Sequence, residues 1–476
     1  MINFIRRSLV ILLTLILLVG CIPAVPAATA TPIPTPAAVK GAPGIGDPYY
    51  PNLGNGGYDV QNYVITMDVD PSTNKVTAST TITANTTEFL SSFNLDFHGL
   101  EVDSVTVDEV DADYSRNGDE LTITPAAPLE ANKPFTTVVQ YHGSPETITS
   151  AGLSGMGWSH GESGVINVWG EPDAASTWFP SDNHPRDKAT YRFEITVPDP
   201  WMVAASGTLK ETNKNESRTT YVWEMDKPLA TYLASISIDQ YELVTQKGPD
   251  GVMIRNYFPM DLPDTYRSQF GIVPEMIDFF NGYFGPYPFS EYGVVIAGKD
   301  GLCGDVQIAL EAQTMSIHCP VDSMTSEMTI SHELAHQWFG DSVSLENWKD
   351  IWLKEGFATY ASWLWQAQGD PTVLKRIASY NSKTFFDSDY SVAEPSREEL
   401  YSNESYNGGA LVLYALQHEL GDETFFKILQ TYSERYQYGN AGTDEFIAVA
   451  EEVSGKDLKS FFDAWLFSPE LPDLPD

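Results

Sequence analysis

The stretch that decides the fold runs from Ser331 to Gly356 and reads SHELAHQWFGDSVSLENWKDIWLKEG. It contains His332, Glu333 and His336 in the pattern H-E-x-x-H. Residues four apart lie on one face of an α-helix, so the two imidazoles can reach the same metal ion. Glu333 follows the first His and can point at a water on that ion. The pattern therefore predicts a metal site on a helix.

A third metal ligand is predicted on the next helix. Catalytic zinc usually takes three protein ligands and leaves a fourth position for water. Eighteen residues separate His336 from Glu355, which lies in the apolar, helix-patterned run from Trp348 to Gln368. A carboxylate in such surroundings needs a partner to offset its desolvation, and a metal supplies one. H-E-x-x-H also occurs by chance in chains that bind no metal. The combination of this pattern with a buried-looking Glu355 eighteen residues later favours one zinc ion per chain.

The two ends of this stretch carry a family resemblance. HELAHQWFGD followed by WLKEGFATY resembles the gluzincin metallopeptidases of the M1 aminopeptidase family, whose pattern is H-E-x-x-H, eighteen residues and then E. The phrases LDFHGL, WFPSDNHPRDKATYRF and TYLASISI resemble the N-terminal β domain of that family. The resemblance implies a zinc aminopeptidase in which His332, His336 and Glu355 bind the metal and Glu333 is the general base.

The resemblance also implies a tyrosine beside the scissile carbonyl. The family carries it in a motif like Y-x-K-G-A, and YNGGA at Tyr406 to Ala410 matches this motif with Gly408 in place of the Lys. A donor near the developing oxyanion is worth about 3 kcal/mol when it is deleted. Tyr406 is therefore expected to act there, and the alternative is a core aromatic residue.

Two further carboxylates are expected to bind the free α-amino group of a peptide. The family places one in a G-x-M-E-N motif, and here IALEA at Ile308 to Ala312 supplies Glu311 but lacks the Asn. The other lies nine residues before the Pro of an F-P motif, and counting back from Pro180 gives Glu171. Carboxylates hold a cation best in a closed pocket, although each of these alone can be a surface charge.

The N-terminus has the pattern of a targeting segment. Two arginines precede an apolar run from Leu9 to Val19, which is too short for a comfortable membrane span. The run ends in LVGC at Cys21, which resembles a bacterial lipobox. We expect a lipoprotein signal peptide (1–20), an Ala-, Pro- and Thr-rich tether (21–46) and an extracytoplasmic protein held to the membrane by lipid on Cys21. The alternative is an ordinary signal peptide with a chance Cys.

Composition limits the possible classes of protein. The chain has 476 residues, of which 42% are hydrophobic and 12% aromatic, so it can build large cores. The formal net charge is −38 and no basic patch is visible, so nucleic acid is a poor partner. The acidity can keep an exported protein soluble or favour cationic substrates.

The expected fold class is α+β with two domains. Residues 47–243 predict an all-β sandwich or saddle, because Tyr63 to Val69 alternates with a period of two and turn signals recur. Residues 244–476 predict a thermolysin-like domain, mixed α/β at first and helical from Met324 onward. We expect the first zinc helix to bury Met324, Met328, Leu334 and Trp338, with Asp322 or Ser323 as its cap.

Two features of this second domain are left with alternatives. Cys303 and Cys319 can form a disulfide in an oxidising compartment or remain buried thiols. Only a short tail follows Phe467, so we expect an open cleft without the further helical domain that many family members carry. The rivals to an aminopeptidase are a thermolysin-like endopeptidase and an inactive homologue that binds peptides.

Overall fold

The computed structural model describes residues 37–475 except 299, 301, 306–308, 321–326 and 385–389. Cys21, the predicted signal peptide and most of the predicted tether lie outside the described residues. The end of that tether lies inside them, where Val39–Lys40 forms strand β1 and pairs in parallel with β4 (Leu90–Asp96). Among the helices of the described residues, none is long and apolar enough to cross a membrane.

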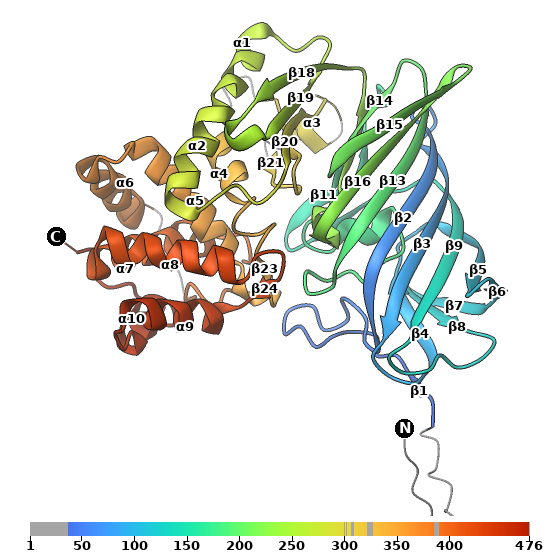
Figure 1. The fold of residues 1–476 in the computed structure, drawn as a ribbon, viewed down its shortest axis with the longest axis horizontal. Coiled ribbons are helices and arrows are strands. Elements are labelled where there is room, and N and C mark those ends of the chain that lie inside the picture. Colours follow the sequence, from blue (N-terminus) through green and yellow to red (C-terminus); the bar gives the residue numbers. More distant parts are fainter. Residues whose placement is uncertain are drawn as a thin grey trace, which may run out of the picture. The chain divides into compact units, whose positions relative to one another are not determined.

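An eight-stranded sheet dominates the N-terminal part, with the order β15-β16-β13-β2-β3-β9-β5-β6 (Figure 1). Its strands are β2 (Tyr58–Asp70), β3 (Lys75–Thr86), β5 (Glu101–Val107), β6 (Val110–Asp111), β9 (Pro134–Gly143), β13 (Lys188–Pro198), β15 (Thr208–Asn215) and β16 (Arg218–Ala230). The alternation predicted from Tyr63 to Val69 is confirmed, because every second side chain from Tyr63 onward is at most 1% exposed.

Two smaller sheets complete this part and confirm the all-β prediction. The four-stranded sheet has the order β1-β4-β8-β7 and adds β7 (Asp113–Asn117) and β8 (Glu120–Thr124). The five-stranded sheet has the order β10-β11-β12-β17-β14, with β10 (Thr147–Ser150), β11 (Leu153–His160), β12 (Ile166–Trp169), β14 (Met202–Ala205) and β17 (Ile236–Asp239). Stacked rings of Tyr63, Tyr191 and Phe193 lie in the core.

The C-terminal part begins with a mixed sheet and continues as helices, as predicted. The sheet has the order β18-β19-β20-β22-β21, with β18 (Tyr241–Lys247), β19 (Met253–Pro259), β20 (Glu291–Ile296), β21 (Ala309–Leu310) and β22 (Ser316–His318). The helices are α1 (Asp264–Arg267), α2 (Val273–Phe284), α3 (Leu302–Asp305), α4 (Glu327–Ala335), α5 (Trp352–Ala367), α6 (Pro371–Thr384), α7 (Gly409–Leu420), α8 (Asp422–Arg435), α9 (Thr443–Ser454) and α10 (Lys459–Trp465). β23 (Ser344–Leu345) and β24 (Asn440–Ala441) form a small ladder.

The first zinc helix differs from its prediction at one described position. Leu334 and Trp338 are buried as expected, but Met328 is 47% exposed. Met328 lies in the first turn of α4, and there the helix lines an open cavity instead of packing on the core. Met324, Asp322 and Ser323 lie outside the described residues.

Cys303 and Cys319 form a disulfide, with their Cα atoms 5.2 Å apart. The bond joins α3 to the residue that follows β22. The structure therefore has the disulfide and not two buried thiols. The bond links α3 covalently to the β21–β22 edge of the five-stranded sheet.

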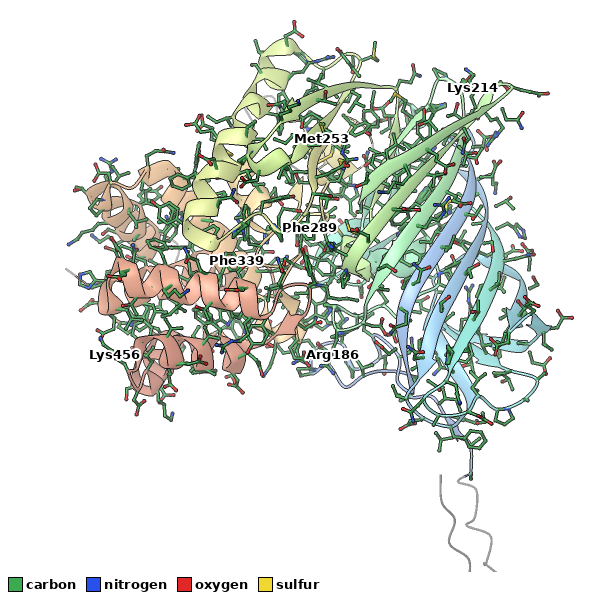
Figure 2. The ribbon with its side chains drawn as sticks, in the orientation of Figure 1. Arg186, Lys214, Met253, Phe289, Phe339 and Lys456 are labelled. Carbon is green, nitrogen blue, oxygen red and sulfur yellow. A yellow bond between two sulfur atoms is a disulfide. The ribbon has the colours of Figure 1, made fainter. Side chains whose placement is uncertain are left out.

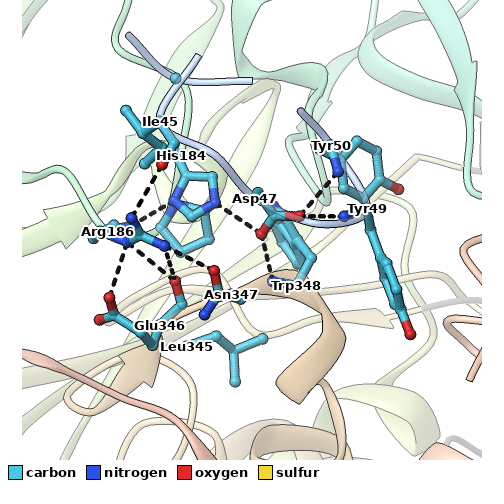
Figure 3. Close-up of polar contacts among 12 residues, drawn as sticks. Ile45, Asp47, Tyr49, Tyr50, His184, Arg186, Leu345, Glu346, Asn347 and Trp348 are labelled. Atoms are coloured by element: carbon cyan, nitrogen blue, oxygen red, sulfur yellow. Dashed lines mark hydrogen bonds and ion pairs between the residues drawn. The ribbon is translucent and has the colours of Figure 1, made fainter. Parts of the chain in front are cut away.

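The segment before β2 is held against the C-terminal part by a buried carboxylate (Figure 3). The side chains of Asp47 and His184 are fully buried, with Oδ2 and Nε2 3.1 Å apart. Asp47 also accepts hydrogen bonds from the backbone N–H groups of Tyr49, Tyr50 and Trp348 at 2.8–2.9 Å. Since Trp348 lies between the predicted metal ligands His336 and Glu355, Asp47 fixes the loop that connects them.

Arg186 fixes the same loop from the β domain. Its guanidinium donates to the carbonyl oxygens of Ile45 and Glu346 and to Oδ1 of Asn347, and it pairs with the Glu346 carboxylate at 3.0 Å. Figure 2 shows Arg186 where the strands meet the helices, whereas Phe339 lies inside the helical part. The connection between the two helices of the predicted site therefore depends on both domains.

We predict that Asp47→Asn lowers the free energy of unfolding by about 2–4 kcal/mol, because an amide N–H would face buried N–H donors. Burial alone would raise the pKa of Asp47, but the bonds from His184 and the backbone hold it below its ordinary value. The stabilisation is therefore present above about pH 3.9 and is lost as pH falls through the lower pKa.

Urea unfolding measures this difference, with Asp113→Asn on the exposed strand β7 as the matched control. Equal stability of Asp47→Asn and the control at neutral pH would contradict the role given to Asp47.

Candidate active site

Three predicted metal ligands converge between two helices. His332 and His336 project from the C-terminal end of α4, and Glu355 lies in the first turn of α5. The two Nε2 atoms are 3.1 Å apart, and Oε2 of Glu355 lies 3.2 Å from the first and 3.5 Å from the second. Donors on a tetrahedral zinc ion with bonds of about 2.0–2.2 Å lie about 3.3 Å apart. The three atoms therefore fit one zinc-sized ion.

The surroundings of the triad orient its ligands. Nδ1 of His336 lies 3.1 Å from the carbonyl oxygen of Phe339, so a proton there leaves Nε2 free to bind metal. Burial alone would raise the pKa of Glu355, but the charges of Lys354 and His336 hold it well below its ordinary value. A carboxylate and two imidazoles facing one point form a donor set suited to a divalent cation.

Two glycines allow Tyr406 to approach the triad. Gly356 of α5 lies against Gly409 of α7, and a Cβ on Gly356 would meet the Cα of Gly409 at 2.7 Å. The helices therefore touch backbone to backbone. The π-helical turn Glu404–Gly408 precedes α7 and places the Tyr406 ring in a stack on His332, with centroids 5.8 Å apart. The residue predicted from YNGGA therefore lies beside a predicted metal ligand, and its role in the reaction stays a prediction.

A cavity of about 950 Å³ opens beside the triad. Glu333 is only 6% exposed, yet it lines this cavity together with His332 and Tyr406. Burial, and then the charges of Glu311 and Glu355, raise the pKa of Glu333 well above its ordinary value. The rest of the wall is mainly apolar and includes Leu153, Met156, Trp169, Leu310 and Trp363. Tyr401 also lines the cavity.

Glu171 and Glu311 lie close together around Lys354, a cation that sequence reasoning missed. Nζ of Lys354 lies 2.5 Å from Oε1 of Glu171, 2.7 Å from Oε1 of Glu311 and 2.6 Å from Oε1 of Glu355. The Lys354 side chain is fully buried. A lysine beside Glu355 in an otherwise apolar helix was the available signal, because a buried ammonium needs carboxylate partners.

The two predicted amine-binding carboxylates differ in access. Glu171 lines the cavity, and burial together with the charge of Glu311 raises the pKa of Glu171. Glu311 is buried, and its own backbone carbonyl accepts a hydrogen bond from Gln337 at 3.0 Å. Gln337 immediately follows His336, so its hydrogen bond connects the segment after strand β21 to the residues that carry the two histidines.

Comparisons with known proteins agree with this arrangement. Residues 59–233 match the Peptidase M1 N-terminal domain, and residues 269–465 match the Peptidase family M1 domain. Aminopeptidase M1-B of Oryza sativa subsp. japonica is 29% identical over 310 residues, which is 60% of this chain and 35% of the rice protein. Aminopeptidase N of Streptomyces lividans is 30% identical over 325 residues, which is 62% of this chain and 37% of that protein. The chain thus spans about a third of the length of these relatives.

Solved structures extend the likeness to almost the whole fold. An M1 zinc metallopeptidase of Deinococcus radiodurans, bound to a Tyr-Ser-Ala substrate, has a TM-score of 0.82 and 28% identity and covers 91% of this chain and 99% of its own. A two-domain M1 zinc metallopeptidase mutant bound to L-arginine has a TM-score of 0.83 and 28% identity, and covers 91% of this chain and 99% of its own. Both domains and the helices that carry the metal triad are shared, and the chain belongs to the M1 peptidase family.

Proposed function

We propose that this protein is a zinc-dependent aminopeptidase that removes the N-terminal residue of peptides. The observation that carries the proposal is the juxtaposition of a metal triad with an anionic cavity end formed by Glu171 and Glu311. A thermolysin-like endopeptidase would not need these two carboxylates together. An inactive homologue would be expected to lack a ligand or the base, whereas His332, His336, Glu355 and Glu333 are all present.

Each residue of the site would have a separate role in peptide hydrolysis. His332, His336 and Glu355 would hold the zinc, which supplies Lewis acidity for the scissile carbonyl and lowers the pKa of water. Glu333 would take a proton from the attacking water and pass it to the leaving amine. The Tyr406 hydroxyl would donate to the oxyanion of the tetrahedral intermediate.

The charges of the site also favour a substrate with a free amine. Burial and the charge of Glu311 raise the pKa of Glu171 to about 8, and Glu171 lines the cavity. The ammonium of a peptide N-terminus beside Glu171 would lower that pKa and form an ion pair with the carboxylate.

The N-terminal pattern supports a location for this activity. We propose that the protein is exported and held at the membrane by lipid on Cys21, because LVGC follows a charged and then apolar segment. Radiolabelled palmitate should enter the wild-type protein and be absent from Cys21→Ala, which should appear in the soluble fraction. Equal membrane retention of both proteins would contradict the anchor.

The first catalytic prediction separates the base from the ligands. Glu333→Gln should keep about one zinc per chain and lose turnover by about a thousandfold or more, because only the proton acceptor is removed. Glu355→Ala should lose the zinc as well as the turnover. Metal analysis of purified proteins and steady-state rates test this, with Glu419→Gln as a surface control. Full zinc content in Glu355→Ala would refute the ligand assignment.

The second catalytic prediction tests the aminopeptidase itself. A leucyl arylamide should be cleaved with a kcat/KM about a hundredfold or more above that of its N-acetylated form, because a charged hydrogen bond to buried carboxylates is worth about 2–4 kcal/mol. Glu311→Ala should slow the free-amine substrate severely and narrow this gap. Glu171→Gln should act in the same direction, with the exposed Glu162→Gln as the matched control.

Comparable cleavage of free and acetylated substrates by the unmutated protein would rule out the aminopeptidase and favour the endopeptidase. Zinc binding without cleavage of either substrate would favour the inactive homologue.

A further inference from the structure

The cavity contains one charged side chain that the proposed reaction does not use. Arg376 of α6 lines the same cavity as Glu171, His332 and Glu333, and it is the only lysine or arginine among the described lining residues. Arg376 is exposed, and within the described parts of the chain it forms no ion pair and donates no hydrogen bond. A guanidinium in this position is available to a ligand.

This availability is uncommon in so acidic a chain. Most arginines elsewhere in the described structure have carboxylate partners, as Arg192, Arg255 and Arg435 do. The exceptions, Arg116 and Arg397, each lie over an aromatic ring. Arg376 also lowers the pKa of Asp370, but the backbone N–H groups of Thr372 and Val373 lower it more. Arg376 therefore remains a local cation in a protein with a formal net charge of −38.

Arg376 follows the active-site helix α5 after one short turn. Gly369 lies in the turn between α5 and α6, and Ser362 and Arg376 are each seven residues from it. The two helices contact each other, as helices joined by so short a turn commonly do. Along α5, Ser362 lies about 10 Å from Glu355 at 1.5 Å per residue.

The cavity follows α5 from the triad to the level of Ser362. Glu355, Thr359, Ser362 and Gln366 lie on one helix face, and the last three line the cavity. Glu171 lines this cavity from the β domain and Arg376 lines it from α6, with His332 and Glu333 also in its wall. A short peptide with its amine at Glu171 would therefore have its C-terminal end in the same cavity as Arg376.

We propose that Arg376 binds the C-terminal carboxylate of short peptide substrates. This inference rests on the proposed function. An extended residue spans about 3.3–3.6 Å, so only a peptide of a few residues would have both its amine at Glu171 and its carboxylate within this one cavity. A guanidinium pairs with a carboxylate through two parallel hydrogen bonds, and the negative field of the chain disfavours a carboxylate elsewhere.

The test compares trialanine with its C-terminal amide. The unmutated protein should cleave the free acid with a kcat/KM about threefold to fivefold higher, mostly through KM, because an exposed ion pair adds uniform binding. Arg376→Gln should bring the ratio of acid to amide near one. The control Lys375→Gln removes the same charge from the next residue, which is exposed and lines a different cavity, and should keep the ratio. The ratio of kcat/KM for the free acid to that for the amide should also be smaller for an octapeptide than for trialanine.

Two results would overturn the inference: no preference for the acid in the unmutated protein, or a preference that survives Arg376→Gln. If the leucyl arylamide still requires a free amine in either case, the aminopeptidase proposal stands and only the carboxylate site fails. Loss of that requirement would instead refute the proposed function. Calorimetric titration of both trialanine forms into zinc-loaded Glu333→Gln gives the same ratio as affinities and needs no turnover.

Discussion

The buried ammonium of Lys354 is the interaction on which the site and the domain arrangement both depend. It lies within 2.7 Å of carboxylates from three parts of the chain: the loop after β12, the end of β21 and α5 itself. Burial alone would lower the pKa of Lys354, but Glu171, Glu311 and Glu355 outweigh it and hold the pKa well above its ordinary value. Without this cation the three acids would repel one another in a place that excludes water.

This ion cluster joins the β domain to the metal site, and a second network supports the connection. Asp47, His184 and Arg186 hold the loop between α4 and α5 from the N-terminal side (Figure 3). The His pair and Glu355 belong to different helices, so their separation depends on that loop. The β domain therefore contributes both part of the cavity wall and the support that keeps the metal ligands together.

The sequence predicted the parts of this site that local spacing determines. H-E-x-x-H and the eighteen-residue interval predicted the triad, because helix periodicity puts the two histidines on one face and a turn to a second helix brings Glu355 back to them. The alternation of residues in β2 predicted the buried face of that strand. Lys354, Asp47 and Arg376 were not predicted, because their partners or positions come from tertiary packing. Met328 was placed wrongly because periodicity cannot distinguish a core from an apolar cavity wall.

The central claim is that one cavity holds a peptide by its amine at the lysine-bridged carboxylates while the metal triad faces the first peptide bond. A crystal structure of zinc-loaded Glu333→Gln with a bound tripeptide tests it most directly. We expect anomalous density for zinc between His332, His336 and Glu355, with the peptide amine on Glu171 and Glu311 and Lys354 still in place. Zinc at another position, or a peptide with its N-terminus directed away from Glu171, would contradict the account.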